Sequence, residues 1–219
     1  MYSKTEEDYL KAIYHFSGQE MDKVGTSMLA DYLSNKPASV TDMLRKLSEK
    51  ALIHYKKSHG VTLTDKGTKV VLQIVRKHRI WETFLVEKLH FGWEEVHELA
   101  DELEHVQSEL LINRLDDFLG YPKFDPHGDP IPTAKGELPE ATTLPLSEVN
   151  ASLKVSFVSV ATDQSSFLQY LDRMELQIGD SFMVKEKEAF DGSLIIKTQK
   201  TEVHISGKVA ENILVRIIQ

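Results

Sequence analysis

Residues 24–63 read VGTSMLADYLSNKPASVTDMLRKLSEKALIHYKKSHGVTL. Apolar residues recur at helical spacing over 24–33 and again over 39–50, and the polar segment SNKPAS separates the two runs. Pro37 suits the first turn of the second helix, because a backbone N–H at that position would have no partner within the helix. Two short helices joined by such a polar turn predict a helix-turn-helix.

The pattern after the second helix predicts a β-hairpin. Residues 53–57 alternate between apolar and polar side chains, residues 58–60 form a Ser-His-Gly turn, and residues 61–63 return as a second strand. A basic hairpin that follows a helix-turn-helix is typical of the wing of a winged helix, where cationic side chains meet DNA phosphates. The side chains placed for that contact are Lys56, Lys57 and His59.

The charge of the chain is unevenly distributed. The formal net charge is −8, yet residues 36–79 hold eleven Lys or Arg against three acidic residues. A basic segment within an acidic chain indicates a local anion-binding module, while the acidic remainder handles cations or contacts between subunits.

The chain lacks cysteine and lacks any long apolar segment, and these two absences exclude several classes of function. The chain has no cysteine, which excludes disulfides, thiolate nucleophiles and sulfur ligands, so any metal must be bound through nitrogen and oxygen. No apolar run reaches the roughly 18 residues of a membrane span, and the N-terminus MYSKTEEDYLK is unlike a secretory signal. We therefore expect a cytoplasmic protein with no membrane partner.

Residues 76–105, RKHRIWETFLVEKLHFGWEEVHELADELEH, hold acidic and imidazole side chains at helical spacing. His78 and Glu82 stand four apart in an amphipathic helix expected over 77–89. In a second helix, expected over 93–119, four further residues fall within an arc of about 100°. These four are His97, Asp101, Glu104 and His105. An acidic helix face is more often merely solvated, but two imidazoles interleaved with two carboxylates match the ligands of a divalent cation.

The remaining pattern predicts a chain that is mainly α with α+β parts. The apolar residues of 77–89 exceed what one core face needs, which indicates a helical homodimer interface. A stretch rich in Pro and Gly follows the second helix, and from Ser152 onward five short strands and one helix predict a small SH3-like β-barrel. The predicted parts are a winged-helix DNA-binding domain (1–72), a helical dimerisation and metal-binding domain (73–135), a linker (136–152) and the barrel (153–219).

Seven segments, spread over nearly the whole chain, carry a resemblance to a known family. They are TEEDYLKAIY, KPASVTDMLRKL, VTLTDKG, RKHRIWETFL, WEEVHELADELEHVQSE, HGDPIPTAKGEL and VATDQSSFLQYLD. Through them the chain resembles the diphtheria-toxin-repressor and manganese-regulator family of metal-dependent transcription factors, whose terminal barrel is of the FeoA type. The resemblance implies a repressor of metal-homeostasis genes that binds pseudo-palindromic double-stranded operator DNA as a homodimer when its metal sites are filled.

The resemblance also implies two sets of metal ligands. The regulatory site maps onto Asp8, Asp101, Glu104 and His105, and the ancillary site maps onto His78, Glu82 and His97. The barrel would add Gln164, whereas Ala161 stands where the family places a carboxylate and Asp163 is the nearest substitute. Lys11 occupies the position at which some manganese regulators have a further Glu ligand. Hard oxygen and imidazole ligands favour Mn²⁺, with Fe²⁺ as the alternative, while Zn²⁺ or Co²⁺ would also bind by raw affinity.

The mechanism implied is a metal-dependent link between two parts of the chain. Asp8 belongs to the first helix, beside the DNA-binding unit, so a cation shared with residues 101–105 would couple metal binding to operator binding. The helices are predicted to contact DNA through Thr26, Ser27, Lys36, Pro37, Ala38, Ser39, Thr41, Asp42 and Arg45. Two other interpretations stay open: a metal-independent winged-helix regulator that senses an organic ligand, and a metal-dependent hydrolase.

Overall fold

The computed structural model describes residues 2–17, 24–56, 60–140 and 142–218. The chain divides into two compact units, each built from several segments. Unit 1 comprises Met1–His78, Glu102–Asn113 and Pro132–Glu137, and unit 2 comprises Arg79–Asp101, Arg114–Ile131 and Leu138–Gln219. Among the described residues, no helix is both long enough and apolar enough to cross a lipid bilayer.

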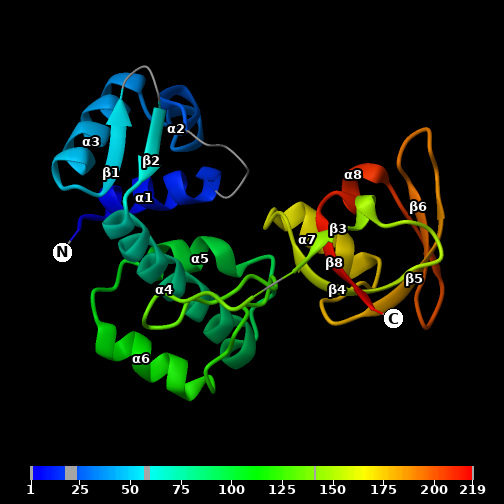
Figure 1. The fold of residues 1–219 in the computed structure, drawn as a ribbon. Helices are drawn as coiled ribbons and strands as arrows, with labels where there is room; N and C mark the ends of the chain where they lie inside the picture. The colour runs from blue at the N-terminus through cyan, green and yellow to red at the C-terminus, as the bar shows by residue number, and fades with distance from the viewer. Residues whose placement is uncertain (1, 18–23, 57–59, 141, 219) are drawn as a thin grey trace. The chain divides into compact units, whose positions relative to one another are not determined.

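Unit 1 contains the winged helix that the sequence predicts. Three helices precede a two-stranded antiparallel hairpin in which Ile53 pairs with Leu63, and the third of these helices lies beside the first strand of the hairpin (Figure 1). The elements are α1 (Lys4–Ser17), α2 (Thr26–Tyr32), α3 (Pro37–Glu49), β1 (Ile53–Lys56) and β2 (Gly60–Leu63). Leu10, Ile13 and Leu44 are fully buried in its core. As predicted, Pro37 occupies the first turn of α3.

A single long helix, α4 (Asp65–Leu89), includes the helix expected over 77–89 and begins well before it. Thr64 begins it, because its hydroxyl oxygen accepts a hydrogen bond of 3.0 Å from the backbone N–H of Gly67. No proline interrupts the segment, so the helical hydrogen bonds continue through His78 and Glu82.

The single helix predicted over 93–119 is wrong, because the chain forms two shorter helices there. They are α5 (Val96–Leu103) and α6 (Glu109–Phe118). Val106 N–H bonds to the Leu103 carbonyl at 3.1 Å in a turn, and Ser108 then caps α6 by accepting from the backbone N–H of Leu111 at 3.2 Å. Glu104 and His105 therefore lie in the turn after α5, and not on its face.

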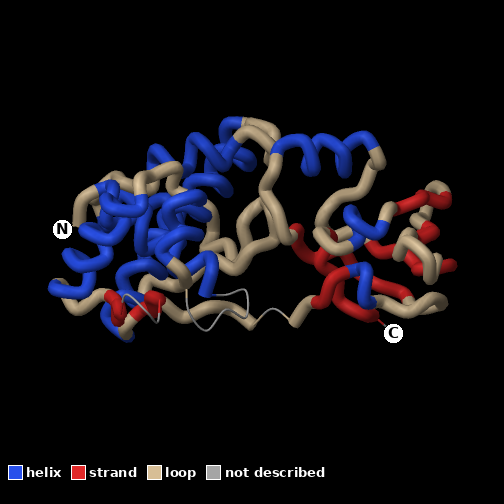
Figure 2. The backbone as a smooth tube through the Cα atoms, turned by 90° about the horizontal axis from the view of Figure 1, so that it is seen from above, coloured by secondary structure: helices blue, strands red, loops and turns tan. Residues whose placement is uncertain are grey.

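Unit 2 contains a six-stranded antiparallel sheet in the order β3-β8-β4-β5-β6-β7 (strands red in Figure 2). Its elements are β3 (Leu144–Pro145), η1 (Leu146–Glu148), β4 (Lys154–Val160), α7 (Ser165–Arg173), β5 (Ser181–Lys187), β6 (Leu194–Lys197), β7 (Glu202–Ile205), α8 (Gly207–Ala210) and β8 (Ile213–Ile218). Phe157 and Phe182 fill the core. The predicted five strands and one helix omit β3 and α8, which are too short to show periodicity, and β3 falls inside the predicted linker.

Candidate metal sites and nucleic-acid interface

The first candidate metal site lies in unit 1 and is formed by Asp8 of α1 with Glu104 and His105 of the turn after α5. One ligand atom from each of these three residues lies within 4.8 Å of the others. The His105 Nε2 atom is 3.2 Å from Asp8 Oδ1 and 3.8 Å from Glu104 Oε1. We call this group the Asp8 cluster.

The imidazole of His105 is held as a metal-binding imidazole would be. Its Nδ1 atom is 2.7 Å from the Oε2 atom of buried Glu7, and Gln107 donates to the other Glu7 oxygen at 3.0 Å. A carboxylate at Nδ1 fixes the ring and leaves Nε2 as the ligand atom. Nε2 is buried and makes no hydrogen bond to any residue that the structure describes, although Asp8 Oδ1 lies 3.2 Å away. An orphaned imidazole nitrogen beside two carboxylates fits a divalent cation.

The charges of the Asp8 cluster also suit a cation. Burial would raise the pKa of Glu104, but contacts with His78 and Lys11 hold it below its usual value, so this carboxylate is ionised. Burial raises the pKa of Asp8, and the charge of Glu104 adds to that rise, although His105 and Lys4 oppose it. Two carboxylates thus share a partly dehydrated space, where positive charge stabilises both.

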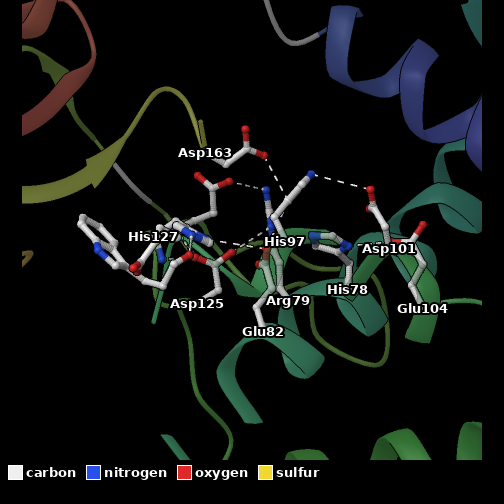
Figure 3. Close-up of polar contacts among 12 residues, drawn as sticks. His78, Arg79, Glu82, His97, Asp101, Glu104, Asp125, His127 and Asp163 are labelled. Atoms are coloured by element: carbon white, nitrogen blue, oxygen red, sulfur yellow. Dashed lines mark hydrogen bonds and ion pairs between the residues drawn. The ribbon is translucent and has the colours of Figure 1, made fainter. Parts of the chain in front are cut away.

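The second candidate site lies in unit 2 and consists of Glu82 of α4 with Asp125 and His127. All three side chains are buried, with ligand atoms within 4.8 Å of one another, and Figure 3 shows them converging. Burial and the charge of Glu82 raise the pKa of Asp125 to about 8. Burial alone would lower the pKa of His127, but the carboxylate of Glu82, whose Oε1 is 3.7 Å from His127 Nδ1, raises it to about 9. The protonated imidazole of His127 supplies positive charge in this Glu82 cluster, and a divalent cation would take the place of that proton.

The loop that carries Asp125 and His127 is ordered by its own hydrogen bonds. Asp125 Oδ1 accepts from the backbone N–H groups of His127 and Asp129 at 2.9 and 3.0 Å, while Arg79 pairs with both carboxylates. His127 Nε2 is 2.8 Å from the Trp93 carbonyl oxygen, and its own carbonyl accepts from Val160 N–H at 3.1 Å. Segments on either side of this loop therefore hold the imidazole in place.

The structure groups the predicted metal ligands differently from the regulatory and ancillary sets that the sequence implied. Asp8, Glu104 and His105 come together, whereas Asp101 contacts His97 at 3.8 Å. Of the ancillary set, Glu82 lies 3.4 Å from His97 Nδ1, which is also 3.1 Å from Asp163 of the barrel. His78 instead contacts Glu104, with Nδ1 and Oε2 2.7 Å apart.

Some residues near these sites were missed by the sequence reasoning. Glu7 stands next to Asp8 in the sequence, but its partner His105 is too distant along the chain for spacing to reveal the pair. Asp125 and His127 occur in the motif DPHGDP, two residues apart, and the surrounding prolines and glycine made the segment resemble a linker. Gln164 is exposed at the N-cap of α7, and Ala161 is exposed before it.

The predicted DNA-contacting residues form an exposed end of the helix-turn-helix. Arg45 pairs with Asp42 at 3.3 Å, and Thr41 donates its hydroxyl to the Pro37 carbonyl at 2.9 Å. The exposed members of the set are Ser27, Lys36, Pro37, Ala38, Ser39, Asp42, Arg45 and Lys56, and the half-buried members are Thr26 and Thr41. Lys57 and His59 lie outside the described residues.

Three models of known protein families match successive segments of the chain. They are "Iron dependent repressor, N-terminal DNA binding domain" at residues 1–61, "Iron dependent repressor, metal binding and dimerisation domain" at 64–133, and "FeoA domain" at 144–217. Together they follow the order of the winged helix, the helices α4 to α6 and the six-stranded sheet.

Individual relatives agree with this assignment. The chain is 37% identical to an uncharacterized HTH-type transcriptional regulator of Methanocaldococcus jannaschii, over 53% of this chain and 94% of the relative. It is 33% identical to the HTH-type transcriptional regulator MntR of Oceanobacillus iheyensis, over 54% of this chain and 80% of that protein. The structure of a manganese-dependent transcriptional repressor in complex with manganese superposes with a TM-score of 0.88 at 33% identity, covering 97% of this chain and 100% of the other. The chain belongs to the diphtheria-toxin-repressor and manganese-regulator family of metal-dependent transcriptional repressors, a class without enzymatic activity.

Proposed function

We propose that this protein is a Mn²⁺-activated repressor that binds pseudo-palindromic operator DNA as a homodimer. The observation that carries the proposal is the Asp8 cluster, where a buried His105 nitrogen without a hydrogen bond faces two carboxylates. Both candidate clusters offer only oxygen and imidazole nitrogen, which suits Mn²⁺ and Fe²⁺. Manganese is preferred because one of the structures above is of a manganese-dependent transcriptional repressor in complex with manganese, and Fe²⁺ is the alternative.

The residues of the Asp8 cluster would link metal occupancy to the DNA-binding helices. Asp8 projects from α1, whose Leu10 and Ile13 are buried in the winged-helix core. Glu104 and His105 belong to the turn after α5. A divalent ion supplies positive charge that removes the repulsion between Asp8 and Glu104. Asp8 would then hold α1 against that turn, and operator binding and metal binding would favour one another.

The Glu82 cluster is proposed as the second metal site. Glu82 and His97 remain from the ancillary ligands inferred from the family, joined by Asp125 and His127, with Asp163 beside His97. This arrangement gives the barrel a carboxylate near the site despite Ala161. His78 is assigned instead to the surroundings of Glu104.

The exposed end of the helix-turn-helix would read the operator. We propose that α3 enters the major groove with Ser39, Asp42 and Arg45 near the bases, while Lys36 and Lys56 contact phosphates.

Helix α6 has two exposed apolar side chains that would contribute to the dimer interface. They are Leu110 and Phe118, which are 70% and 63% exposed.

A gel-shift titration of chelator-stripped protein with Mn²⁺, Fe²⁺ under anaerobic conditions, Zn²⁺ and Co²⁺ tests the proposal. Operator binding should require metal, and Mn²⁺ should restore it. Glu104→Gln should abolish the response, whereas Glu102→Gln, an exposed acid two residues away, should not. Undiminished binding by stripped wild-type protein would refute metal activation.

A further inference from the structure

A lysine ammonium lies inside the group of metal-binding candidates in unit 1. Lys11 Nζ is 2.7 Å from Glu104 Oε2 and 3.0 Å from His78 Nδ1. Glu104 is only 1% exposed, while the Lys11 side chain, which reaches it from α1, is 25% exposed. A mobile lysine side chain is thus ordered against a buried carboxylate.

The two oxygens of Glu104 have different partners. Oε2 faces Lys11 and His78, at 2.7 Å from each, whereas Oε1 faces His105 Nε2 at 3.8 Å. Oε1 therefore belongs to the Asp8 cluster, and Oε2 belongs to an internal ion pair. One carboxylate serves a cation fixed to the protein and a cation that arrives from solution.

Like charges that share one carboxylate repel one another, and the repulsion is strong where water is excluded. In the metal-free protein, Lys11 compensates the buried charge of Glu104 and so stabilises the fold. When a divalent ion binds, the same ammonium opposes it. These two effects have opposite signs, which makes the role of Lys11 measurable.

We propose that Lys11 is a tethered counter-cation, which competes with the activating divalent ion for Glu104 and thereby sets the metal concentration at which the protein responds. The inference rests on the proposed function, because it requires that Glu104 be a metal ligand. It assigns to Lys11 a tuning role that an ordinary stabilising ion pair would not have.

The test compares Lys11→Met, Lys11→Arg and wild type in the full chain. Calorimetric titration of stripped protein gives the Mn²⁺ affinity, and thermal melts with and without Mn²⁺ give the metal-induced rise in Tm. Lys11→Met should bind Mn²⁺ more tightly by about tenfold or more, because two cations that share one carboxylate repel one another strongly at protein-like dielectric constants. Its metal-free Tm should fall and its metal-induced rise should grow, while Lys11→Arg should resemble wild type.

Lys50→Met is the matched control, since Lys50 pairs with another buried carboxylate, Glu6, at 2.6 Å outside the cluster. It should lower Tm equally with and without Mn²⁺ and leave the affinity unchanged. If Lys11→Met behaves like Lys50→Met, or binds Mn²⁺ more weakly, Lys11 is only structural or assists the metal, and the inference is overturned. Should Lys11→Met fold poorly, Lys11→Gln gives the same comparison. Failure of wild type itself to bind Mn²⁺ would instead refute the proposed function.

Discussion

At the scale of single residues, the buried carboxylate of Glu7 is the clearest case of a residue that acts through another. Glu7 bonds to His105 Nδ1 and is in turn held by Gln107, so it fixes which nitrogen His105 offers. We predict that Glu7→Gln weakens Mn²⁺ binding by about 10- to 100-fold, the range seen when the partner of a ligating histidine is lost. Calorimetric titration measures this effect, with Glu102→Gln as control. Equal affinities in the two variants would contradict the assignment.

The neighbouring Glu6 has a structural role with a definite pH dependence. Burial would raise its pKa, but hydrogen bonds from Lys50, the Ser3 backbone and Lys46 lower it from 4.5 to about 2. A depressed pKa stabilises the fold above pH 4.5, and that contribution disappears as pH falls towards 2. Because both lysines are substantially exposed, we expect Glu6→Gln to cost only about 2 kcal/mol at pH 7.

Urea unfolding at pH 7, 5 and 3 measures this contribution. The difference in unfolding free energy between wild type and Glu6→Gln should shrink as pH decreases, because the Glu6 carboxylate of the unfolded chain takes up a proton at a higher pH than the carboxylate of the folded chain. A difference that stays constant from pH 7 to pH 3 would show that charge is not its source. Lys46→Met, which removes the more exposed of the two lysines, should have a smaller effect than Lys50→Met.

Residue spacing predicted part of the candidate sites and could not predict the rest. The pair Glu104 and His105 was found from its neighbourhood of acids and imidazoles, although the helix assumed to carry it does not extend that far. Contacts such as Glu7 with His105 join residues 98 positions apart, and no local periodicity encodes them. Spacing gives the chemical types of the ligands, whereas tertiary packing decides which of them meet.

At the scale of elements, the break between α5 and α6 shows where helical periodicity misleads. The apolar spacing continues through residues 104–108, but the hydroxyl of Ser108 caps a new helix and allows the chain to turn. The winged helix was predicted well because Pro37 and the alternation of 53–56 are strong local signals. The loop 124–130 has no such periodicity, so the Glu82 cluster could not be found from sequence.

The conformation of that loop depends on Gly128. Gly128 has φ +83°, and a Cβ atom there would lie 2.1 Å from the Val158 carbonyl oxygen. Gly128→Ala should therefore destabilise the protein by about 3 kcal/mol, from backbone strain together with a clash against β4. Gly179→Ala is the control, because φ is +98° there but the space is open, and we expect a loss of about 1 kcal/mol. Equal losses, measured by denaturant unfolding, would mean that the loop moves away from β4.

At the scale of the whole molecule, the order of parts was predictable because each has a distinct sequence pattern. The winged helix, the helical segment and the terminal barrel were all expected, and the family comparisons confirm this architecture. The contribution of the barrel to the surroundings of the Glu82 cluster was harder to predict from the sequence. Trp93 donates its indole N–H to Asp172 of α7 and stacks on His127, and such a contact depends on how α7 packs within unit 2.

The Glu82 cluster and the Asp8 cluster differ in protonation state. Their affinities for a metal ion should therefore depend differently on pH. At pH 7, Asp125 and His127 carry protons, because their pKa values are raised to about 8 and about 9. Metal binding to the Glu82 cluster should therefore release protons, and its affinity should rise with pH until both groups are deprotonated. At the Asp8 cluster, Glu104 is already ionised, so proton release should be smaller.

Calorimetric titration of the stripped full chain with Mn²⁺, in two buffers of different ionisation enthalpy, separates the two sites. Wild type should bind two ions per chain with heats that depend on the buffer. Asp8→Asn should retain the buffer-dependent event, because its Glu82 cluster is intact, whereas Glu82→Gln should retain one event that is nearly buffer-independent. Glu102→Gln should match wild type. If Glu82→Gln keeps the full proton release, or if wild type binds a single ion, the Glu82 cluster is a hydrogen-bonded part of the fold and not a metal site.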